Sequence, residues 1–342
     1  MSKDPFEIVP AGHRETARTA VAAAFGASPV EAIVPVMGGV SGASVFRVEI
    51  RGRPYVMRIE GPASPLRNPH QYASMRIAAE AGIAPRLHYV DEQARVAVMD
   101  FIAARPLAAY PDGQVGLARA VGELLARLQA TERFPHFVTY PDIVARLWAH
   151  VCRTGLFASG VLDAATERLA RIREGHVWNP EHSVSSHNDV LPRNMLFDGR
   201  RLWLIDWESA YRNDPVVDVG TALDNFAPSP DLESVLLHAW FGCAPDRQLH
   251  ERLAPARALT RLYYAGVLFS AAAVGNRPEP DADISALTGE EFARAIRGGR
   301  LKPDTFETSH ALGKMYLASF LSGERPPGLP PPLSAFAIKE LE

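Results

Sequence analysis

The stretch from His187 to Glu208 constrains the fold of this chain more than any other, and it reads HNDVLPRNMLFDGRRLWLIDWE. Asp189 stands five residues before Asn194, and Asp206 follows the apolar run behind them. The turn Asp198-Gly199 between two short apolar segments predicts an antiparallel hairpin. We expect this loop and hairpin to bring two carboxylates and an amide to one place.

The spacing H-x-D-x-x-x-x-N, followed by an aspartate at the end of a strand, is typical of phosphoryl-transfer catalytic loops. In that interpretation Asp189 accepts or orients the acceptor hydroxyl, while Asn194 and Asp206 hold Mg²⁺ on the phosphates of ATP. His187 is structural and holds the loop by packing or hydrogen bonding. The alternative is a polar turn before a hairpin, with solvated acids. The joint occurrence of all three side chains favours the catalytic interpretation.

Bulk composition excludes several other classes of protein. The chain has 342 residues, which favours two or more lobes, and a net charge of −3 gives no sign of a nucleic-acid surface. Its two cysteines, Cys152 and Cys243, cannot form a disulfide framework. The first residues lack a signal-peptide core, and no apolar stretch is long enough to span a bilayer. We therefore expect a cytoplasmic protein with neither a nucleic-acid nor a membrane partner; its oligomeric state stays open.

Hydrophobic periodicity divides the chain into three parts. Residues 1–103 are expected to form a five-stranded lobe, with strands at 34–36, 44–50, 53–59, 86–90 and 95–100 and helices at 13–25 and 71–81. Residues 104–323 are expected to form a helical lobe around the catalytic loop, with helices at 115–129, 142–152, 161–173, 215–224, 232–241, 255–274, 290–296 and 305–321. Residues 324–342 are a proline-rich tail, expected to be extended. The predicted fold class is α+β, with a small antiparallel-sheet lobe before a larger helical lobe.

A glycine-rich segment between the first two predicted strands could bind phosphate. Glycine lets backbone N–H groups approach phosphate oxygens, and a serine can add a hydroxyl donor, so the candidates are Gly38, Gly39, Ser41 and Gly42. The segment matches neither the Walker A pattern nor a strict G-x-G-x-x-G. A simple hairpin turn would look the same, and only its place upstream of the catalytic loop favours nucleotide binding.

Two predicted strands of the small lobe could bind the rest of the nucleotide. Arg58 stands on the strand 53–59, where a kinase normally carries a lysine that pairs with the phosphates. Its apolar neighbours favour a buried functional residue over a surface arginine. The strand 95–100 leaves the lobe, and an adenine edge could bond to the backbone of Met99, Asp100, Phe101 and Ile102. A mere connecting strand is the alternative, because backbone recognition leaves no side-chain signature.

Asp218 follows the metal aspartate on a helix predicted to begin near Asp214-Pro215. It could brace the catalytic loop by accepting its N–H groups. It could equally be an acid stabilised by the helix dipole. The two interpretations are compatible.

The signature HND-x4-N-x10-IDWE, with NDPVVDVG behind it, resembles the choline/ethanolamine kinase and aminoglycoside phosphotransferase superfamily, from about Val34 to Phe241. The Trp-Glu pair after the metal aspartate is similar to the choline kinase branch. The resemblance implies a bilobal protein-kinase-like fold, ATP and Mg²⁺ as cofactors, and transfer of the γ-phosphate to an alcohol. It implies Asp189 as the catalytic base, Asn194 and Asp206 as metal ligands, and Arg58 in the place of the lysine.

One position departs from the family pattern. The helix after the basic residue usually supplies a glutamate that pairs with it, and here its early positions are His70, Gln71 and Tyr72. Either Gln71 substitutes with a neutral hydrogen bond, or an acid elsewhere pairs with Arg58.

The helical lobe is expected to bind a small alcohol, with a choline- or ethanolamine-like acceptor favoured. A quaternary ammonium binds best against aromatic faces and acids, so the candidates are Trp207, Glu208, Trp240 and Tyr263. Core packing is the ordinary role of such aromatics, and Glu208 could serve in a structural salt bridge. The functional alternatives are an aminoglycoside or another small alcohol such as homoserine as acceptor, or a catalytically weak nucleotide-binding regulatory module.

Overall fold

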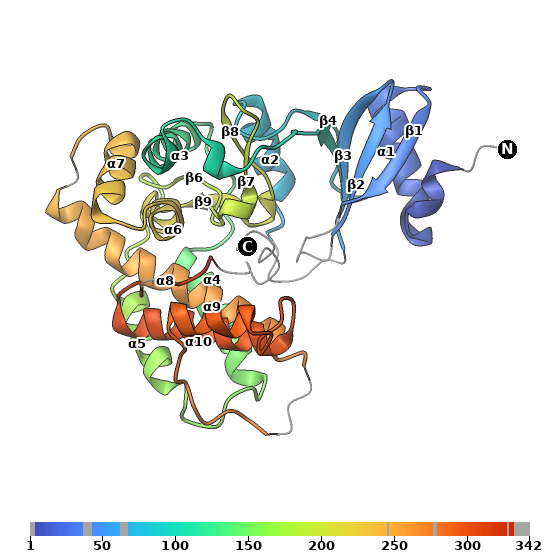
Figure 1. Cartoon of the computed structure of the whole chain (residues 1–342). Coiled ribbons are helices and arrows are strands. Elements are labelled where there is room, and N and C mark those ends of the chain that lie inside the picture. The colour runs from blue at the N-terminus through green and yellow to red at the C-terminus, as the bar shows by residue number, and fades with distance from the viewer. Residues whose placement is uncertain are drawn as a thin grey trace.

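A computed structural model describes residues 4–36, 43–61, 68–244, 246–275, 279–326 and 328–331. It has two lobes, with a small sheet-bearing lobe at the N-terminal end and helices in most of the remainder (Figure 1). The α+β class expected from the sequence, with a small antiparallel-sheet lobe before a larger helical lobe, is confirmed.

The small lobe is built on one antiparallel sheet with the order β1-β2-β3-β5-β4. Its strands are β1 (Val30–Pro35), β2 (Ser44–Ile50), β3 (Arg53–Ile59), β4 (Leu87–Asp91) and β5 (Val96–Asp100), and its helices are α1 (Arg14–Phe25) and α2 (Gln71–Glu80). These agree with the predicted elements within a few residues. Only β1 begins well before its predicted start, at Val30 instead of Val34.

Strand alternation gives the sheet two different faces. On β3, Met57 and Ile59 are buried in an apolar cluster with residues of α1. Val56 and Arg58 point to the other face, where they line a cavity. The same strand thus supplies core packing on one side and a charged group to the cavity on the other.

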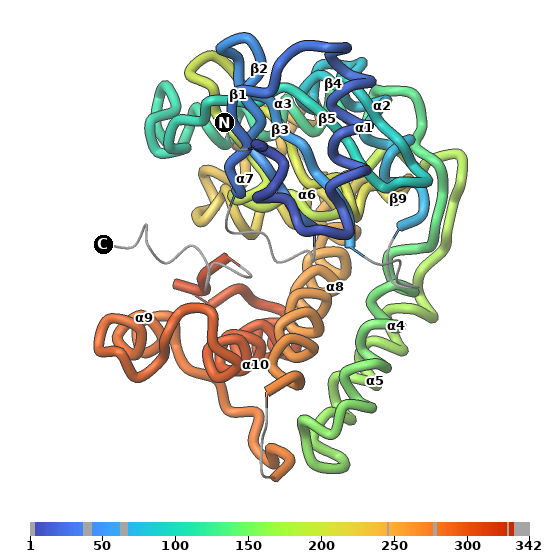
Figure 2. The backbone as a smooth tube through the Cα atoms, turned by 90° about the vertical axis from the view of Figure 1, so that its right-hand side faces the viewer, coloured from blue at the N-terminus to red at the C-terminus, as the bar shows by residue number. Residues whose placement is uncertain are grey.

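The large lobe consists mostly of helices. They are α3 (Gly113–Gln129), α4 (Tyr140–Arg153), α5 (Asp163–Glu174), α6 (Val216–Phe226), α7 (Pro230–Phe241), α8 (Arg247–Ala272), α9 (Gly289–Arg297) and α10 (Phe306–Ser322). Helix α3 packs against α7, and α8 packs against both α10 and α4. Figure 2 shows α8 descending with α10 on one side and α4 and α5 on the other. Short 3-10 helices occur at Pro5–Ile8, Ala11–His13, Leu107–Ala109, Pro192–Asn194 and Trp207–Ser209.

The start of α8 corrects one prediction. The sequence predicts a helix over residues 255–274. The helix instead begins at Arg247, where the Asp246 side chain accepts the N–H of Leu249 at 2.7 Å, and Pro255 lies in its interior. An N-terminal cap therefore decides the boundary, and the proline is accommodated.

Two small strand pairs carry the candidate catalytic segment, which runs from His187 to Glu208. The predicted hairpin is formed by β7 (Met195–Phe197) and β8 (Leu202–Leu204). A second pair, β6 (Val184–Ser186) with β9 (Tyr211–Asn213), was not predicted. It closes the segment into a loop by joining its two ends.

The lobes are fastened to each other beside this segment. The carbonyl of Ala210 accepts hydrogen bonds from Asn68 Nδ2 at 2.5 Å and from Ser74 Oγ, on α2, at 2.7 Å. The N–H of Leu204 on β8 donates to the carbonyl of Ile83 at 3.0 Å. One apolar cluster continues across the junction, from α2 and β5 to α3 and β8.

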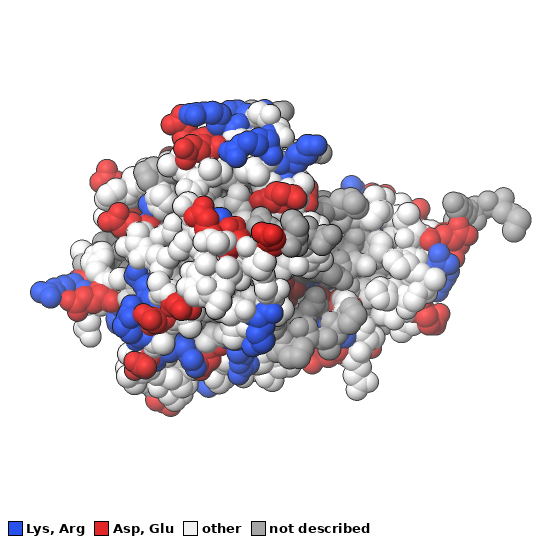
Figure 3. All heavy atoms as spheres, turned by 90° about the horizontal axis from the view of Figure 1, so that it is seen from below, with Lys and Arg blue, Asp and Glu red and all other residues white. Residues whose placement is uncertain are grey.

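Part of the proline-rich tail packs on the helical lobe. Leu329 is buried, and the Tyr316 hydroxyl of α10 donates to the carbonyl of Pro330 at 2.6 Å. On the face seen in Figure 3, Lys and Arg lie among Asp and Glu instead of forming a field of one sign. Within the described ranges, no helix combines the length and the apolar character that crossing a membrane requires.

Candidate active site

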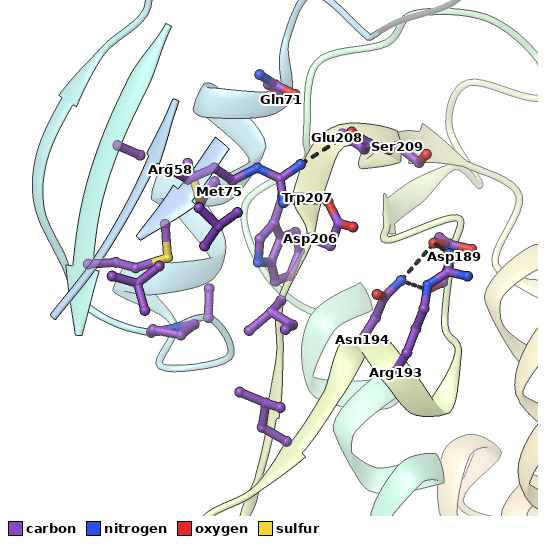
Figure 4. Close-up of a pocket in the computed structure, with 18 of the residues that line it drawn as sticks. Arg58, Gln71, Met75, Asp189, Arg193, Asn194, Asp206, Trp207, Glu208 and Ser209 are labelled. Carbon is purple, nitrogen blue, oxygen red and sulfur yellow. Dashed lines mark hydrogen bonds and ion pairs between the residues drawn. The ribbon is translucent and has the colours of Figure 1, made fainter. Parts of the chain in front are cut away.

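A cavity of about 580 Å³ lies between the sheet and the catalytic segment. Figure 4 shows Arg58 entering it from the small lobe and Asp189, Asn194 and Asp206 from the large lobe. The sequence predicted these four residues from separate motifs, and the structure brings them to one cavity.

Asp218 holds the candidate catalytic loop in place through hydrogen bonds to its backbone. This fully buried carboxylate accepts the backbone N–H of His187 at 2.8 Å and that of Asn188 at 2.7 Å. Burial raises the pKa of Asp218, while His187 and the two N–H donors act in the opposite direction. Asn188 has a left-handed backbone (φ 60°), a conformation that costs energy for a residue with a side chain. The two hydrogen bonds help to hold that conformation.

His187 ties the loop to the hairpin. Its Nε2 donates to the carbonyl of Ile205 at 2.9 Å, because a carbonyl oxygen can only accept. Its ring meets Trp207 edge to face, with 4.7 Å between centroids. These contacts fix the backbone immediately before Asp206.

Asn194 and Asp206 are neighbours because of the hairpin register. Met195 pairs with Leu204, and the N–H of Ile205 donates to the carbonyl of Asn194 at 3.0 Å. Asp206 then adopts a left-handed backbone (φ 66°), which interrupts the strand direction. Both side chains line the cavity.

The donor set at this point fits Mg²⁺. The amide nitrogen of Asn194 is directed at Asp189, with Nδ2 at 2.6 Å from Oδ2, so the amide oxygen faces the other way. The Oδ1 atom of Asp206 is buried and has no hydrogen bond within the described residues, although it lies in an ion pair with Arg58. Hard carboxylate and amide oxygens are the protein ligands that Mg²⁺ prefers.

Asp189 is surrounded by donors. Its Oδ2 accepts from Asn194 and, at 2.9 Å, from Arg193 Nη2, while its Oδ1 accepts from the Tyr264 hydroxyl at 2.9 Å. Its side chain is 12% exposed, on the cavity side. The sequence identified Asp189 and Asn194, but it assigned no such role to Arg193 or Tyr264.

Arg58 contacts three carboxylates. Its guanidinium lies 2.5 Å from Glu60, 2.8 Å from Asp206 and 3.2 Å from Glu208. Burial acts against the charged form, but the carboxylates of Asp206, Glu60 and Glu208 outweigh it and raise the pKa of Arg58. The acid that the family pattern expects from the helix is therefore supplied from elsewhere. Glu60, one residue past the end of β3, was not foreseen.

The end of β5 and the residues that follow it also line the cavity. Met99, Asp100, Phe101 and Ile102 line it, as the adenine prediction requires. The N–H of Asp100 is engaged by the carbonyl of Arg86 at 2.9 Å, so a base edge would have to use the next residues. Gly38, Gly39, Ser41 and Gly42 lie outside the described residues.

The predicted acceptor residues separate into two groups. Trp207, Glu208 and Tyr263 line the cavity. Trp240 does not line it: its indole donates to Gln129 of α3 at 2.8 Å, in the packing between α3 and α7. Helical spacing placed this ring against a neighbouring helix, which is the ordinary role of such a residue.

A second, smaller cavity of about 30 Å³ adjoins the first and shares Glu208, Ser209 and Tyr263 with it. Four aromatic side chains line it: Phe137, Tyr140, Tyr211 and Tyr263. Phe137 meets Tyr211 edge to face at 5.6 Å, and Tyr140 lies 6.0 Å from Tyr263. Aromatic faces beside one carboxylate form a suitable environment for a small organic cation.

Comparison with known proteins finds a matching family model and several similar proteins. The model of the phosphotransferase enzyme family matches residues 32–256. Protein LicA of Haemophilus influenzae is 35% identical over 65 residues, which are 19% of this chain and 24% of LicA, so the match spans about a quarter of that relative.

Solved structures share the fold at low sequence identity. A choline/ethanolamine kinase family protein from Mesorhizobium loti superposes with a TM-score of 0.62 at 20% identity, covering 95% of this chain and 99% of that one. Choline kinase LicA from Streptococcus pneumoniae gives 0.60 at 16%, covering 78% and 93%. LicA in complex with AMP gives 0.62 at 15%, covering 90% and 98%.

Proposed function

Because this chain belongs to the phosphotransferase enzyme family, we propose that it is an ATP-dependent kinase that transfers the γ-phosphate to the hydroxyl of a small alcohol. A choline- or ethanolamine-like acceptor is favoured. The observation that carries the proposal is that Asp189, Asn194, Asp206 and Arg58 line one cavity. Two free thiols, Cys152 and Cys243, fit a role in the reducing cytoplasm.

In the proposed reaction, ATP lies between the sheet and the catalytic hairpin. The backbone beyond Met99 bonds the adenine edge, and Arg58 neutralises phosphate charge from β3. A structure of LicA holds AMP, which supports nucleotide binding by this fold. Asn194 and Asp206 hold Mg²⁺, and the bound ion neutralises further charge on the phosphates.

Asp189 is the group proposed to face the acceptor. It orients the hydroxyl and takes its proton as the oxygen attacks the γ-phosphorus and the bond to ADP breaks. Most of the rate enhancement in such a site comes from positioning and charge neutralisation. The two N–H bonds from the catalytic loop to Asp218 support this by fixing the loop.

The acceptor is proposed to enter from the side of the smaller cavity. Its four aromatic rings and Glu208 suit a cationic head group, with the hydroxyl directed toward Asp189. The likeness to choline/ethanolamine kinase family structures supports the same class. Aminoglycosides and other small alcohols such as homoserine are the second candidates, because similar structures include both choline kinases and a kanamycin-binding phosphotransferase.

A catalytically weak nucleotide-binding module is the competing proposal. It drew its support from the missing helix glutamate and from arginine in place of lysine. The carboxylate of Glu60, 2.5 Å from Arg58, weighs against it, because the basic residue has its acidic partner after all.

The decisive experiment is an ADP-release assay with choline, ethanolamine, homoserine and an aminoglycoside, using the wild type and Asp189→Asn. We expect turnover with a cationic amino alcohol, reduced about a thousandfold in the variant while nucleotide still binds. Asp231→Asn, at an exposed position of α7, is the matched control and should keep full activity. Equal rates for wild type and Asp189→Asn would refute the proposed mechanism.

A further inference from the structure

The carboxylate of Asp189 is held at both of its oxygens by side chains from two separate parts of the large lobe. Arg193 and Asn194, in the 3-10 turn that follows the loop, donate to Oδ2. Tyr264, in the middle of α8, donates to Oδ1. Figure 4 shows Arg193 and Asn194 side by side beneath Asp189.

From this arrangement we propose that Arg193 and Tyr264 are positioning residues for phosphoryl transfer, acting on opposite oxygens of Asp189 so that Oδ1 meets the acceptor hydroxyl at a fixed angle. The proposal rests on the kinase function above. Neither residue is assigned to the chemical step, and both act through Asp189.

Tyr264 is suited to this role because it is immobile and neutral. It is 3% exposed, and its ring packs edge to face against Tyr263 at 5.5 Å and Tyr316 at 6.0 Å. Burial and the nearby Asp189 carboxylate raise the pKa of Tyr264 well above its usual value. The hydroxyl therefore stays protonated and presents a donor to Oδ1.

Arg193 supplies the opposing contact, with a permanent charge. Burial disfavours its charged form, but the carboxylate of Asp189 outweighs burial and raises the pKa of Arg193. Its Nη2 lies 2.9 Å from Oδ2, and its side chain is 32% exposed toward the cavity. A planar guanidinium fixes the direction of this bond more firmly than a lysine ammonium would.

Hydrogen bonds to both oxygens matter because the carboxylate of Asp189 would otherwise rotate about its Cβ–Cγ bond. Two donors occupy Oδ2. Oδ1 is therefore the oxygen that can accept a hydrogen bond from an acceptor hydroxyl in addition to the one from Tyr264. Small displacements of a catalytic group cost on the order of a hundredfold in rate. Arg193 and Tyr264 line the same cavity as Asp206, so their polar atoms lie at the site and not in the apolar core.

The test uses Tyr264→Phe, Arg193→Met and Arg193→Lys in the full chain. We expect kcat to fall about tenfold in Tyr264→Phe and about a hundredfold in Arg193→Met, with KM for ATP unchanged within about twofold. Arg193→Lys should restore part of the lost rate. The matched control is Tyr316→Phe, which removes the same atom from a neighbouring buried tyrosine whose hydroxyl bonds only the tail carbonyl of Pro330 among the described residues; it should keep kcat even if Tm falls.

A double-mutant cycle with Asp189→Asn separates positioning from stability. If Arg193 and Tyr264 act through Asp189, adding Tyr264→Phe or Arg193→Met to Asp189→Asn should change the residual rate by less than about twofold. Equal losses on both backgrounds, or a lower Tm with full kcat, would overturn the inference while leaving the kinase function intact. A wild type that releases ADP with none of the alcohols would instead remove the proposed function, and the inference with it.

Discussion

Arg58 of the small lobe and Asp206 of the large lobe form an ion pair across the cavity, with 2.8 Å between Nη1 and Oδ1. Arg58 also contacts Glu60, one residue past the end of its own strand, and Glu208 beyond the hairpin. One guanidinium thus joins the candidate phosphate-binding strand to the candidate metal ligand.

Replacing Arg58 should affect both nucleotide affinity and stability. Arg58→Met leaves three carboxylates close together without a counter-charge, so we expect a loss of about 3 kcal/mol in the free energy of unfolding and a higher KM for ATP. Arg58→Lys should recover most of the stability and part of the affinity. Arg247→Met, which breaks an exposed pair with Glu251, should cost under about 1 kcal/mol. Urea unfolding and ATP titrations measure these effects, and equal costs for Arg58→Met and Arg247→Met would contradict them.

Replacing Asp206 should remove the magnesium dependence of nucleotide binding. Asp206→Asn retains the shape of the side chain but lacks the charge that attracts a divalent ion. Calorimetric titration of ATP, with and without Mg²⁺, should show tighter binding with the ion in the wild type and no difference in the variant. Asp231→Asn serves again as the exposed control. If magnesium still strengthened ATP binding to Asp206→Asn, another residue would have to hold the ion.

The aromatic face of Tyr263 should matter more than its hydroxyl for a cationic acceptor. Tyr263→Phe keeps the ring and should change kcat/KM for choline by less than about threefold, whereas Tyr263→Leu should lower it about tenfold. The uncharged isostere dimethylbutanol provides the comparison, since it has the same shape without the cation. The ratio of kcat/KM values for choline and dimethylbutanol should fall only in Tyr263→Leu. An unchanged ratio would place the head group elsewhere.

Because of the contacts of Asp281, the thermal stability of the protein should depend on pH. His310 Nε2 lies 2.6 Å and Lys314 Nζ 2.8 Å from its Oδ2. Burial raises the pKa of Asp281, but Lys314, the N–H of Asp283 and His310 outweigh it and lower the pKa. A carboxyl whose pKa is lower in the folded than in the unfolded state stabilises the fold above the unfolded value of about 3.9, and this contribution is lost as pH falls through the folded pKa.

We therefore expect Asp281→Asn to lower Tm by about 5 °C near neutral pH. The difference from the wild type should shrink as the pH is lowered below about 4, because the carboxyl of the unfolded wild type is protonated first and that of the folded wild type only at its lower pKa. Asp304→Asn, at an exposed position just before α10, offers a comparison outside this cluster. A difference in Tm that stayed constant with pH would show that charge is not its cause.

The elements that sequence analysis predicted well are those with strong periodicity or a fixed spacing. The hairpin around Asp198-Gly199 follows from a turn signal between apolar strands, and the helices near α3 and α10 follow from their apolar spacing. The pair β6 and β9 was missed because each strand has three residues, too few for any period. The predicted start of α8 at residue 255 was too late because the cap at Asp246 was not recognised.

For the site, the sequence identified residues within one motif and missed those brought in by the tertiary fold. Glu60 could have been found, because residues two apart on a strand share a face, and Arg58 was already assigned to the cavity. Arg193 lies inside the motif, but its spacing gave no reason to connect it with Asp189. Tyr264 reaches Asp189 from a distant helix, so only the packing of α8 reveals the contact.

The two bonds accepted by the Ala210 carbonyl determine what can move when the enzyme loads its substrates. Asn68, just before α2, and Ser74 of α2 both donate to Ala210, which follows the hairpin in the large lobe. We therefore expect α2 to move together with the large lobe. Helix α2 also packs on β4, so any movement of the sheet against the large lobe has to shift β4 relative to this helix.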